Sequence, residues 1–265
     1  MNPIERLEGI YLASIPPFLY FKSPAVTRYE HSLRAAELVK FVKAPKDVKE
    51  ILREALLWHD AGSYAFSHLG EKIAKLYGMP DHEERVLELL PENADEEVFR
   101  IFERKSELSK FVFNTIDLDN IDNLASYLRG YGREPLYSPR RLAESFSYPP
   151  FSFNPPEDEL EKWRRTRAII YRSLLDPNMI ILDGMLEEAF LKADRPEILL
   201  LTDREAFSEL KRTKGREIAM KIEKWELWKI RRMEISPEPP EDYNRVLEIP
   251  VLKERPLYVG VDFET

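Results

Sequence analysis

Apolar residues recur at steps of three and four in two neighbouring stretches near the N-terminus, and both stretches are predicted to be helices. The stripe within residues 30–43 consists of His31, Ala35, Leu38 and Val42. The stripe within residues 46–59 consists of Val48, Ile51, Leu52, Ala55, Leu56 and His59. A stripe of this kind turns toward the core. Each stripe therefore carries a histidine at one end that is predicted to face the interior.

Two shorter segments follow with clear helix boundaries. The segment Ser67–Gly78 ends in the glycine that commonly closes a helix. Asp81 can cap the next helix, because Glu84 stands three residues later as the reciprocal partner of a capping box. This places His82 in the first turn of that helix.

The segment Phe111–Leu128 is largely apolar yet contains three aspartates, and we expect an internal helix. These acids are Asp117, Asp119 and Asp122. Because a buried carboxylate needs a partner, each should contact a cation or a hydrogen-bond donor. For Asp117 and Asp122 a structural role, as a helix cap or ion-pair partner, is the simpler expectation.

The remainder of the chain is predicted to be helical except for one long loop and the tail. Residues 130–157 are rich in Gly, Pro and aromatic residues and are predicted to form a loop, a candidate lid. Helices are expected at 158–175, at 178–193, and from the capping signal at 202–205 to about residue 233, with an interruption at Gly215. The tail segments VLEIPVL and LYVGVDF are typical of strands, and a small hairpin is expected there.

These elements predict a mainly all-α fold in two parts. The first is a helical domain over residues 1–198. The second, over residues 199–265, is a helical appendage with a short β-prone tail.

Composition excludes several classes of protein. The 265 residues have 43% hydrophobic and 33% charged residues, typical of a globular chain, and a net charge of −8. This charge argues against nucleic acid as a partner, and no apolar run approaches the about 18 residues of a membrane helix. There is no cysteine, so thiolate metal sites are excluded. Because the N-terminus does not resemble a signal peptide, we expect a cytoplasmic protein.

The adjacent pair His59-Asp60 is the first indication of chemistry. Two polar groups at the end of an apolar stripe are costly to bury without a partner. A divalent metal ion would be such a partner, because it binds neutral imidazole and ionised carboxylate. Alone, the pair is more simply explained as a core histidine bonded to a helix end. All four histidines lie in the first third of the chain: His31, His59, His68 and His82.

The order His31, His59-Asp60, Asp119 resembles that of the HD-domain phosphohydrolases. The likeness is closest to the deoxynucleoside triphosphate triphosphohydrolases, the branch that includes the SAM-and-HD-domain enzyme. The segments that carry the resemblance are Thr27–Leu33, His59–Gly62, Phe66–His68, His82-Glu83, Asp117–Asp119, Asp122, Thr166-Arg167 and Ala189–Asp194.

The resemblance implies a helical HD-type bundle and a role for each matching residue. It implies that one divalent metal ion is bound by His31, His59, Asp60 and Asp119. It also implies that His82 and its carboxylate partner Glu71 are catalytic. It implies substrate contacts from Arg28 to a phosphate, from His68, and from Arg167 to a phosphate.

The chain departs from this branch at the positions that read the nucleotide. A second histidine after the His-Asp pair is replaced by Ser63, and a phosphate-binding lysine by Asn120. A sugar-contacting tyrosine is replaced by Asn123, and a later aspartate by Tyr127. The segment Leu174–Pro177 stands where the branch has a Tyr-x-x-Lys pattern.

We therefore predict a metal-dependent phosphohydrolase that acts on a nucleotide. The most specific form of this prediction is a dNTP triphosphohydrolase-like activity. A nucleotide monophosphatase and a non-catalytic nucleotide-sensing or scaffold protein remain as alternatives. The metal could be Mn, Mg, Ni, Co, Fe or Zn. The expected partner is a nucleotide or another phosphorylated small molecule, with no membrane partner, and the sequence leaves open whether the protein forms a homo-oligomer.

Overall fold

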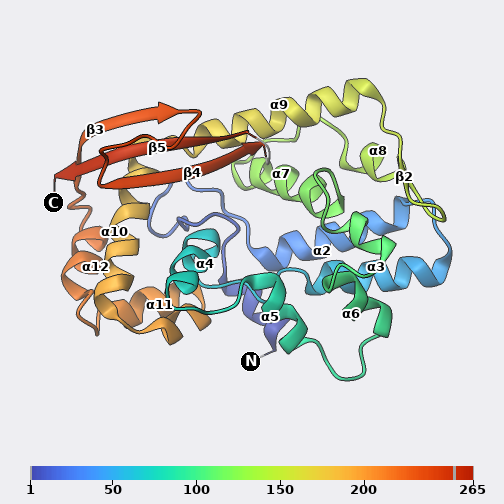
Figure 1. Ribbon diagram of the computed structural model, residues 1–265, viewed down its shortest axis with the longest axis horizontal. Coiled ribbons are helices and arrows are strands. Elements are labelled where there is room, and N and C mark those ends of the chain that lie inside the picture. Colours follow the sequence, from blue (N-terminus) through green and yellow to red (C-terminus); the bar gives the residue numbers. More distant parts are fainter. Residues whose placement is uncertain (1, 253–254, 265) are drawn as a thin grey trace. The chain divides into compact units, whose positions relative to one another are not determined.

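A computed structural model describes residues 2–252 and 255–264. The chain is mainly helical, as predicted (Figure 1), and it divides into two compact units. The first unit consists of residues 2–166 and 195–209, and the second of residues 167–194 and 210–264. The predicted domains, residues 1–198 and 199–265, follow a different boundary and stay a prediction.

The first unit contains most of the helices. Its elements up to α6 are α1 (Pro3–Arg6), η1 (Leu7–Gly9), α2 (Arg28–Leu38), η2 (Val39–Phe41), α3 (Lys46–Trp58), α4 (Ser67–Leu76), α5 (His82–Leu89) and α6 (Glu96–Phe102). They are followed by η3 (Glu107–Phe111), α7 (Leu118–Gly130), α8 (Pro139–Ala143), β1 (Phe146–Ser147), β2 (Ser152–Phe153), α9 (Glu157–Ser173), η4 (Pro196–Leu200) and α11 (Asp203–Leu210). Helices α9 and α11 continue beyond the bounds of this unit.

Helices α2, α3 and α7 pack together as the centre of the first unit (Figure 1). The predicted stripes form this core, because Ala35 of α2 and Leu52, Ala55 and Leu56 of α3 are fully buried. Leu124 contributes from α7. The predicted direction of both stripes is thus confirmed.

Three helix starts are fixed by side-chain caps. Thr27 and Glu30 form a capping box at α2, and Asp81 and Glu84 form the predicted one at α5. Helix α7 begins at Leu118 and not at residue 111 as expected, because the Asp117 side chain accepts a hydrogen bond from the Asn120 N–H. A side chain that caps a helix stands at its end and not in its interior.

The predicted loop at 130–157 is more ordered than expected. It contains α8 and a two-stranded antiparallel pair in which Phe146 faces Phe153. These rings stack at 4.3 Å between centroids, and Phe111 packs against Phe146 and Phe151. The aromatic residues that suggested a loop instead contact one another around a short hairpin, in which Phe146 is fully buried.

The second unit combines two helices with a three-stranded antiparallel sheet. Its elements are α10 (Pro177–Ala193), α12 (Arg216–Glu223), β3 (Lys229–Ser236), β4 (Arg245–Leu252) and β5 (Arg255–Glu264). The strand order is β3-β5-β4, which confirms the predicted hairpin of the tail. The buried residues Ile180, Val259 and Val261 form its core.

The helix expected to reach about residue 233 ends at Glu223 instead. Trp225 adopts a left-handed conformation with φ 60°, and the Glu226 N–H donates to the Lys221 carbonyl. This is the hydrogen-bond pattern of a helix C-terminus that usually contains glycine. The basic segment beyond it forms the edge strand β3.

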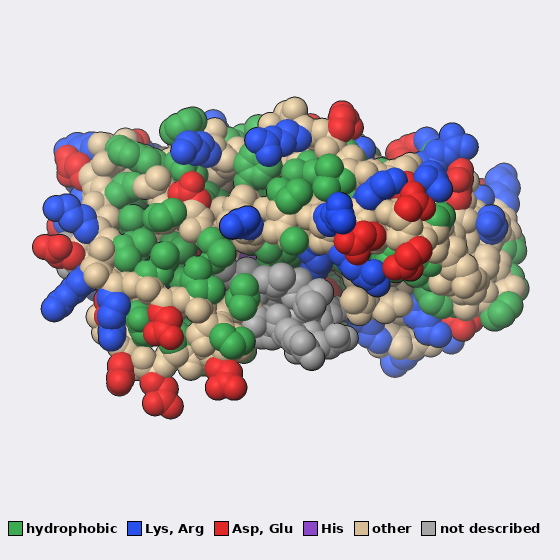
Figure 2. All heavy atoms as spheres, turned by 90° about the horizontal axis from the view of Figure 1, so that it is seen from above, with side chains coloured by type: hydrophobic (Ala, Val, Ile, Leu, Met, Phe, Trp, Pro, Cys, Tyr) green, Lys and Arg blue, Asp and Glu red, His purple; other side chains and the backbone are tan. Residues whose placement is uncertain are grey.

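The surface carries charges of both signs. Figure 2 shows one face, on which hydrophobic side chains stand among lysines, arginines, aspartates and glutamates. Within the described residues, every helix is too short or too polar to cross a membrane.

Candidate metal centre

Three helices bring nitrogen and oxygen ligand atoms together at one point. His31 comes from α2, His59 is the C-cap residue directly after α3, and Asp119 is the second residue of α7. The Asp119 Oδ1 atom lies 2.8 Å from His31 Nε2 and 3.4 Å from His59 Nε2, and the two nitrogens are 3.2 Å apart. These three residues form a group that could hold a metal ion.

Asp60 brings a fourth atom to the same place. Its Oδ2 atom lies 3.6 Å from His59 Nε2 and 4.0 Å from His31 Nε2. Among the residues that the structure describes, this oxygen is buried and accepts no hydrogen bond. Ligand atoms about 2.1 Å from one cation and about 90–110° apart are separated by about 3.0–3.4 Å. The separations among His31, His59 and Asp119, 2.8–3.4 Å, lie in or near this range, so these three residues fit a divalent metal ion. Asp60 Oδ2 lies somewhat farther out, at 3.6 and 4.0 Å from the two Nε2 atoms, and as a buried oxygen that accepts no hydrogen bond from the described residues it is the candidate fourth ligand.

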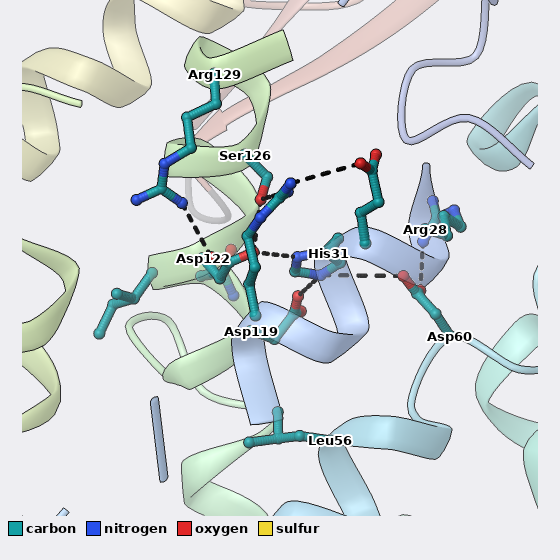
Figure 3. Close-up of polar contacts among 12 residues, drawn as sticks. Arg28, His31, Leu56, Asp60, Asp119, Asp122, Ser126 and Arg129 are labelled. Carbon is teal, nitrogen blue, oxygen red and sulfur yellow. Dashed lines mark hydrogen bonds and ion pairs between the residues drawn. The ribbon is translucent and has the colours of Figure 1, made fainter. Parts of the chain in front are cut away.

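The far nitrogen of each imidazole is held by a fixed acceptor. His31 Nδ1 lies 2.9 Å from Asp122 Oδ2, and His59 Nδ1 lies 2.7 Å from the Leu56 carbonyl oxygen. Because these acceptors take the Nδ1 proton, Nε2 is the ring atom that faces the centre, and it would bind a metal ion once it carries no proton. Figure 3 shows His31 between Asp119, Asp122 and Asp60.

Asp122 is itself held by neighbours on α7. The Ser126 hydroxyl donates to its Oδ2 at 2.6 Å, and Arg129 Nη1 lies 3.6 Å from its Oδ1 (Figure 3). The side chain is almost fully buried. Asp122 is therefore a hydrogen-bond partner of His31, in line with the structural role predicted for it.

The buried carboxylates of the centre favour positive charge beside them, on an imidazole ring or on a bound cation. Burial opposes protonation of His31, yet hydrogen bonds to Asp119 and Asp122 raise its pKa to about 10. Burial also opposes ionisation of Asp60, but Arg28 lowers the pKa of this carboxyl to about 2. In the same way His59 and His31 hold the pKa of Asp119 below its usual range despite burial. A bound cation would meet two ionised carboxylates.

Arg28 lies beside the centre but is committed to Asp60. Its Nη1 forms a short ion pair with Asp60 Oδ1, and its Nε donates to the Ser67 hydroxyl at 2.8 Å (Figure 3). The side chain is 5% exposed. The structure thus shows Arg28 holding the Asp60 carboxylate, and a direct phosphate contact stays a prediction.

The other predicted histidines and Glu71 form a second cluster, on α4 and α5. His82 Nδ1 lies 3.0 Å from Glu71 Oε2, and His68 Nδ1 lies 3.9 Å from the same oxygen. Although partial burial opposes ionisation, hydrogen bonds from His68 and His82 lower the pKa of Glu71. The predicted pair His82–Glu71 is therefore in contact, while His68 is mostly exposed.

A glycine joins the two clusters. Gly62 follows Asp60 by two residues, and a Cβ atom placed on it would lie 1.9 Å from the His82 carbonyl oxygen. Arg85 donates to the Gly62 carbonyl and stacks over Tyr64. The loop after the His-Asp pair is thus packed directly against the first turn of α5.

Arg167, the predicted second phosphate contact, belongs to the second unit. Its guanidinium lies over the Tyr171 ring, 4.7 Å from the centroid. Its role as a substrate contact stays a prediction.

Sequence analysis did not assign two residues that support the site. Ser67 connects Arg28 to the N-terminal segment, and Asp203 accepts hydrogen bonds from two backbone N–H groups far away in sequence. Asp203 stands inside the recognised capping signal at 202–205, but no local pattern shows what a carboxylate contacts across the fold.

Residues 28–131 match the family model described as the HD domain. The matched segment contains all four residues of the candidate metal centre. A solved structure of a phosphohydrolase from Bacteroides thetaiotaomicron VPI-5482 resembles this one with a TM-score of 0.71 and 19% sequence identity. The similarity covers 91% of this chain and 75% of that one, and it establishes the fold. No curated protein matches the chain.

Proposed function

We propose that the protein hydrolyses a phosphate ester or anhydride with one divalent metal ion bound by His31, His59, Asp60 and Asp119. The observation that carries the proposal is the buried, bare Oδ2 of Asp60 beside two Nε2 atoms. Such a set of imidazole and carboxylate ligands suits Mn, Mg, Ni, Co, Fe or Zn. The HD-domain match and the fold of a phosphohydrolase support the same reaction class.

The metal would lower the pKa of water and offset the negative charge of phosphoryl oxygens. The side chain of Asp119 is 27% exposed, whereas His31 is fully buried. The centre is therefore accessible from the Asp119 side. A phosphorylated substrate would approach there.

His82 is the proposed general acid. Glu71 accepts the hydrogen bond from Nδ1 of His82 and so fixes the orientation of the ring. The Nε2–H is then available to protonate the leaving oxygen when the phosphorus–oxygen bond breaks. His68 is the proposed substrate contact next to this pair. The reaction needs no covalent enzyme intermediate.

The proposed substrate is a nucleotide, and the number of phosphates removed distinguishes two versions. Resemblance to the dNTP triphosphohydrolases favours release of tripolyphosphate. Asn120, which replaces a phosphate-binding lysine, instead donates its side-chain amide to Asp117 at 3.0 Å. This observation favours a nucleotide monophosphatase as the second candidate.

The test is product analysis over a panel of nucleoside mono-, di- and triphosphates with each candidate metal. We expect nucleoside plus tripolyphosphate, or nucleoside plus inorganic phosphate, and a loss of at least about 100-fold in kcat for Asp60→Asn and His82→Ala. Glu83→Gln, next to His82 but paired with Arg104, is the matched control and should keep activity. Tight metal binding without turnover on any substrate would contradict catalysis and support a nucleotide-sensing or scaffold protein.

A further inference from the structure

Asp203 is a fully buried carboxylate outside the segment that matches the HD domain. It is the first residue of α11. Its Oδ2 accepts a hydrogen bond from the Tyr11 N–H at 2.9 Å, and its Oδ1 accepts one from the Phe66 N–H at 2.7 Å. One side chain thus joins two backbone segments that are distant in sequence.

The loop after His59-Asp60 rests on the segment that leads into α11. The Ala65 N–H donates to the Leu199 carbonyl at 2.8 Å, one residue before the contact of Phe66 with Asp203. The same segment approaches the N-terminal part closely, because a Cβ atom on Gly9 would lie 2.5 Å from Thr202 Cγ2. Through these contacts residues 199–203, here called the brace, support the loop of residues 61–66 that follows His59-Asp60.

Arg6 ties the other end of this loop to the brace. Its guanidinium donates to the Ser63 carbonyl by a short hydrogen bond and to the Leu201 carbonyl at 3.0 Å. Burial lowers the pKa of Arg6 to about 10, which leaves it charged at neutral pH. The loop is therefore braced on both sides of its turn.

The loop needs such a brace because its backbone is strained. Phe66 has φ 63° and Ser67 has φ 51°, so two successive residues with side chains occupy the left-handed region. L-residues rarely adopt this conformation, and it persists where surrounding contacts impose it. The hydrogen bond from the Phe66 N–H to Asp203 is one of these contacts.

The strained turn leads directly to the metal centre. The Ser67 hydroxyl donates to the Tyr11 carbonyl at 2.5 Å and accepts from Arg28 Nε at 2.8 Å. Arg28 in turn binds Asp60 Oδ1, which leaves Oδ2 of Asp60 facing the imidazoles. Asp203 accepts hydrogen bonds from the backbone of Phe66, the residue before Ser67, and of Tyr11, whose carbonyl accepts the hydrogen bond of the Ser67 hydroxyl.

We propose that Asp203 is a positioning residue for the metal centre, acting through Ser67 and Arg28 on the orientation of the Asp60 carboxylate. The inference rests on the proposed function, because it concerns the affinity of the same metal site. Burial raises the pKa of Asp203 to about 7. Burial makes this carboxyl group costly to ionise, yet its two oxygens accept hydrogen bonds from two backbone N–H groups.

The experiment compares Mn²⁺ affinity of the full chain and of Asp203→Asn by titration calorimetry. Asparagine keeps the size of the side chain but presents an N–H₂ group to one backbone N–H, so one of the two hydrogen bonds is lost. We expect a Kd about 10-fold or more weaker, as for other groups that orient metal ligands. The Co²⁺ absorption spectrum should change as well, because it reports the geometry of the ligands.

Glu205→Gln is the matched control. Glu205 accepts hydrogen bonds from the N–H and hydroxyl of Thr202 at the start of the same helix, two residues from Asp203. This variant should weaken the helix start and leave Mn²⁺ affinity and the Co²⁺ spectrum unchanged. An equal loss of affinity in both variants would assign the effect to general stability and overturn the proposal.

Ser67→Ala tests the route. If Asp203 acts through Ser67, the double variant should bind Mn²⁺ about as weakly as the weaker single variant, whereas independent effects would multiply. Should Asp203→Asn lose its circular dichroism signal, Ser67→Ala alone must still weaken binding, and unchanged binding would overturn the relay. Wild-type protein that binds no Mn²⁺ would instead contradict the proposed function itself.

Discussion

At the scale of single residues, the centre depends on the atoms that face away from it. His31 uses Nδ1 on Asp122, His59 uses Nδ1 on the Leu56 carbonyl, and Asp60 uses Oδ1 on Arg28. In each case the outer contact leaves the other polar atom of the side chain, Nε2 or Oδ2, directed inward. These contacts reduce the conformational entropy that metal binding would otherwise cost.

The first prediction concerns Asp122. Asp122→Asn should weaken Mn²⁺ binding about 10- to 100-fold, because an amide no longer supports the Nδ1–H tautomer of His31 with a full negative charge. Titration calorimetry measures the effect. Ser126→Ala is the control: it removes one donor to the carboxylate and should cost much less. Equal affinities of wild type and Asp122→Asn would show that the outer contact is irrelevant.

The second prediction concerns the pH dependence of the metal-free protein. The pKa of His31 is raised to about 10, so its stabilising contribution is complete below about pH 6.5 and is lost as pH rises toward 10. Asp117 acts in the same direction: burial raises its pKa to about 8, so the folded state loses stability as pH rises toward 8. Thermal midpoints measured with chelator should fall from pH 6.5 to 9.

His31→Gln provides the comparison for this experiment. Its thermal midpoint should depend less on pH over the same interval, because the titrating ring is absent. A midpoint of the wild-type protein that is constant or rises between pH 6.5 and 9 would contradict the assignment.

At the scale of elements, the ends of helices build the site. His59 is the last residue of the α3 stripe, Asp119 lies in the first turn of α7, and His82 lies in the first turn of α5. Asp117 caps α7 and Asp81 caps α5. By fixing where each helix begins, they determine where the side chains of Asp119 and His82 point. The loop of Gly62 fixes α5 against the His-Asp pair.

The third prediction concerns that loop. Gly62→Ala should destabilise the fold by about 2 kcal/mol or more, because the added methyl group meets the His82 carbonyl, a backbone atom that cannot rotate away. The shift of α5 should also lower kcat through His82. Denaturant unfolding and phosphate-release assays measure the two effects. The neighbouring Ser63→Ala, which loses only a 3.4 Å contact with Asp60, should stay close to wild type.

At the scale of the whole molecule, metal binding and stability are linked. Because ligand atoms from α2, α3 and α7 converge only in the folded state, a metal ion should bind the unfolded chain weakly. Residues 195–209 join the same unit although they lie far beyond the matched HD segment. The centre therefore depends on chain far outside the motif that carries its ligands.

The fourth prediction follows from this linkage. Mn²⁺ at about 100 times its Kd should stabilise the protein by about 2.7 kcal/mol, seen as a higher thermal midpoint, and a chelator should reverse the change. His59→Ala should abolish the shift. Exposed Glu37, paired with Lys40, provides a control substitution to Gln that should retain it. Equal midpoints with and without metal would argue against binding.

The sequence predicts what depends on local pattern and misses what depends on distant contacts. The helical stripes and the capping box at Asp81 follow from local spacing. Trp225 ends its helix in a conformation that favours glycine, so no glycine marked the boundary before β3. The order of His31, His59-Asp60 and Asp119 in the sequence pointed to the candidate centre. Asp203 and Phe66, in contrast, stand 137 positions apart, and no local pattern predicts their contact.

The most direct test of the metal centre is anomalous diffraction from a crystal of the protein soaked in Mn²⁺. The account predicts one peak about 2.0–2.3 Å from His31 Nε2, His59 Nε2, Asp60 Oδ2 and Asp119 Oδ1. Its absence from this point, with Oδ2 of Asp60 still bare at saturating metal, would contradict the account.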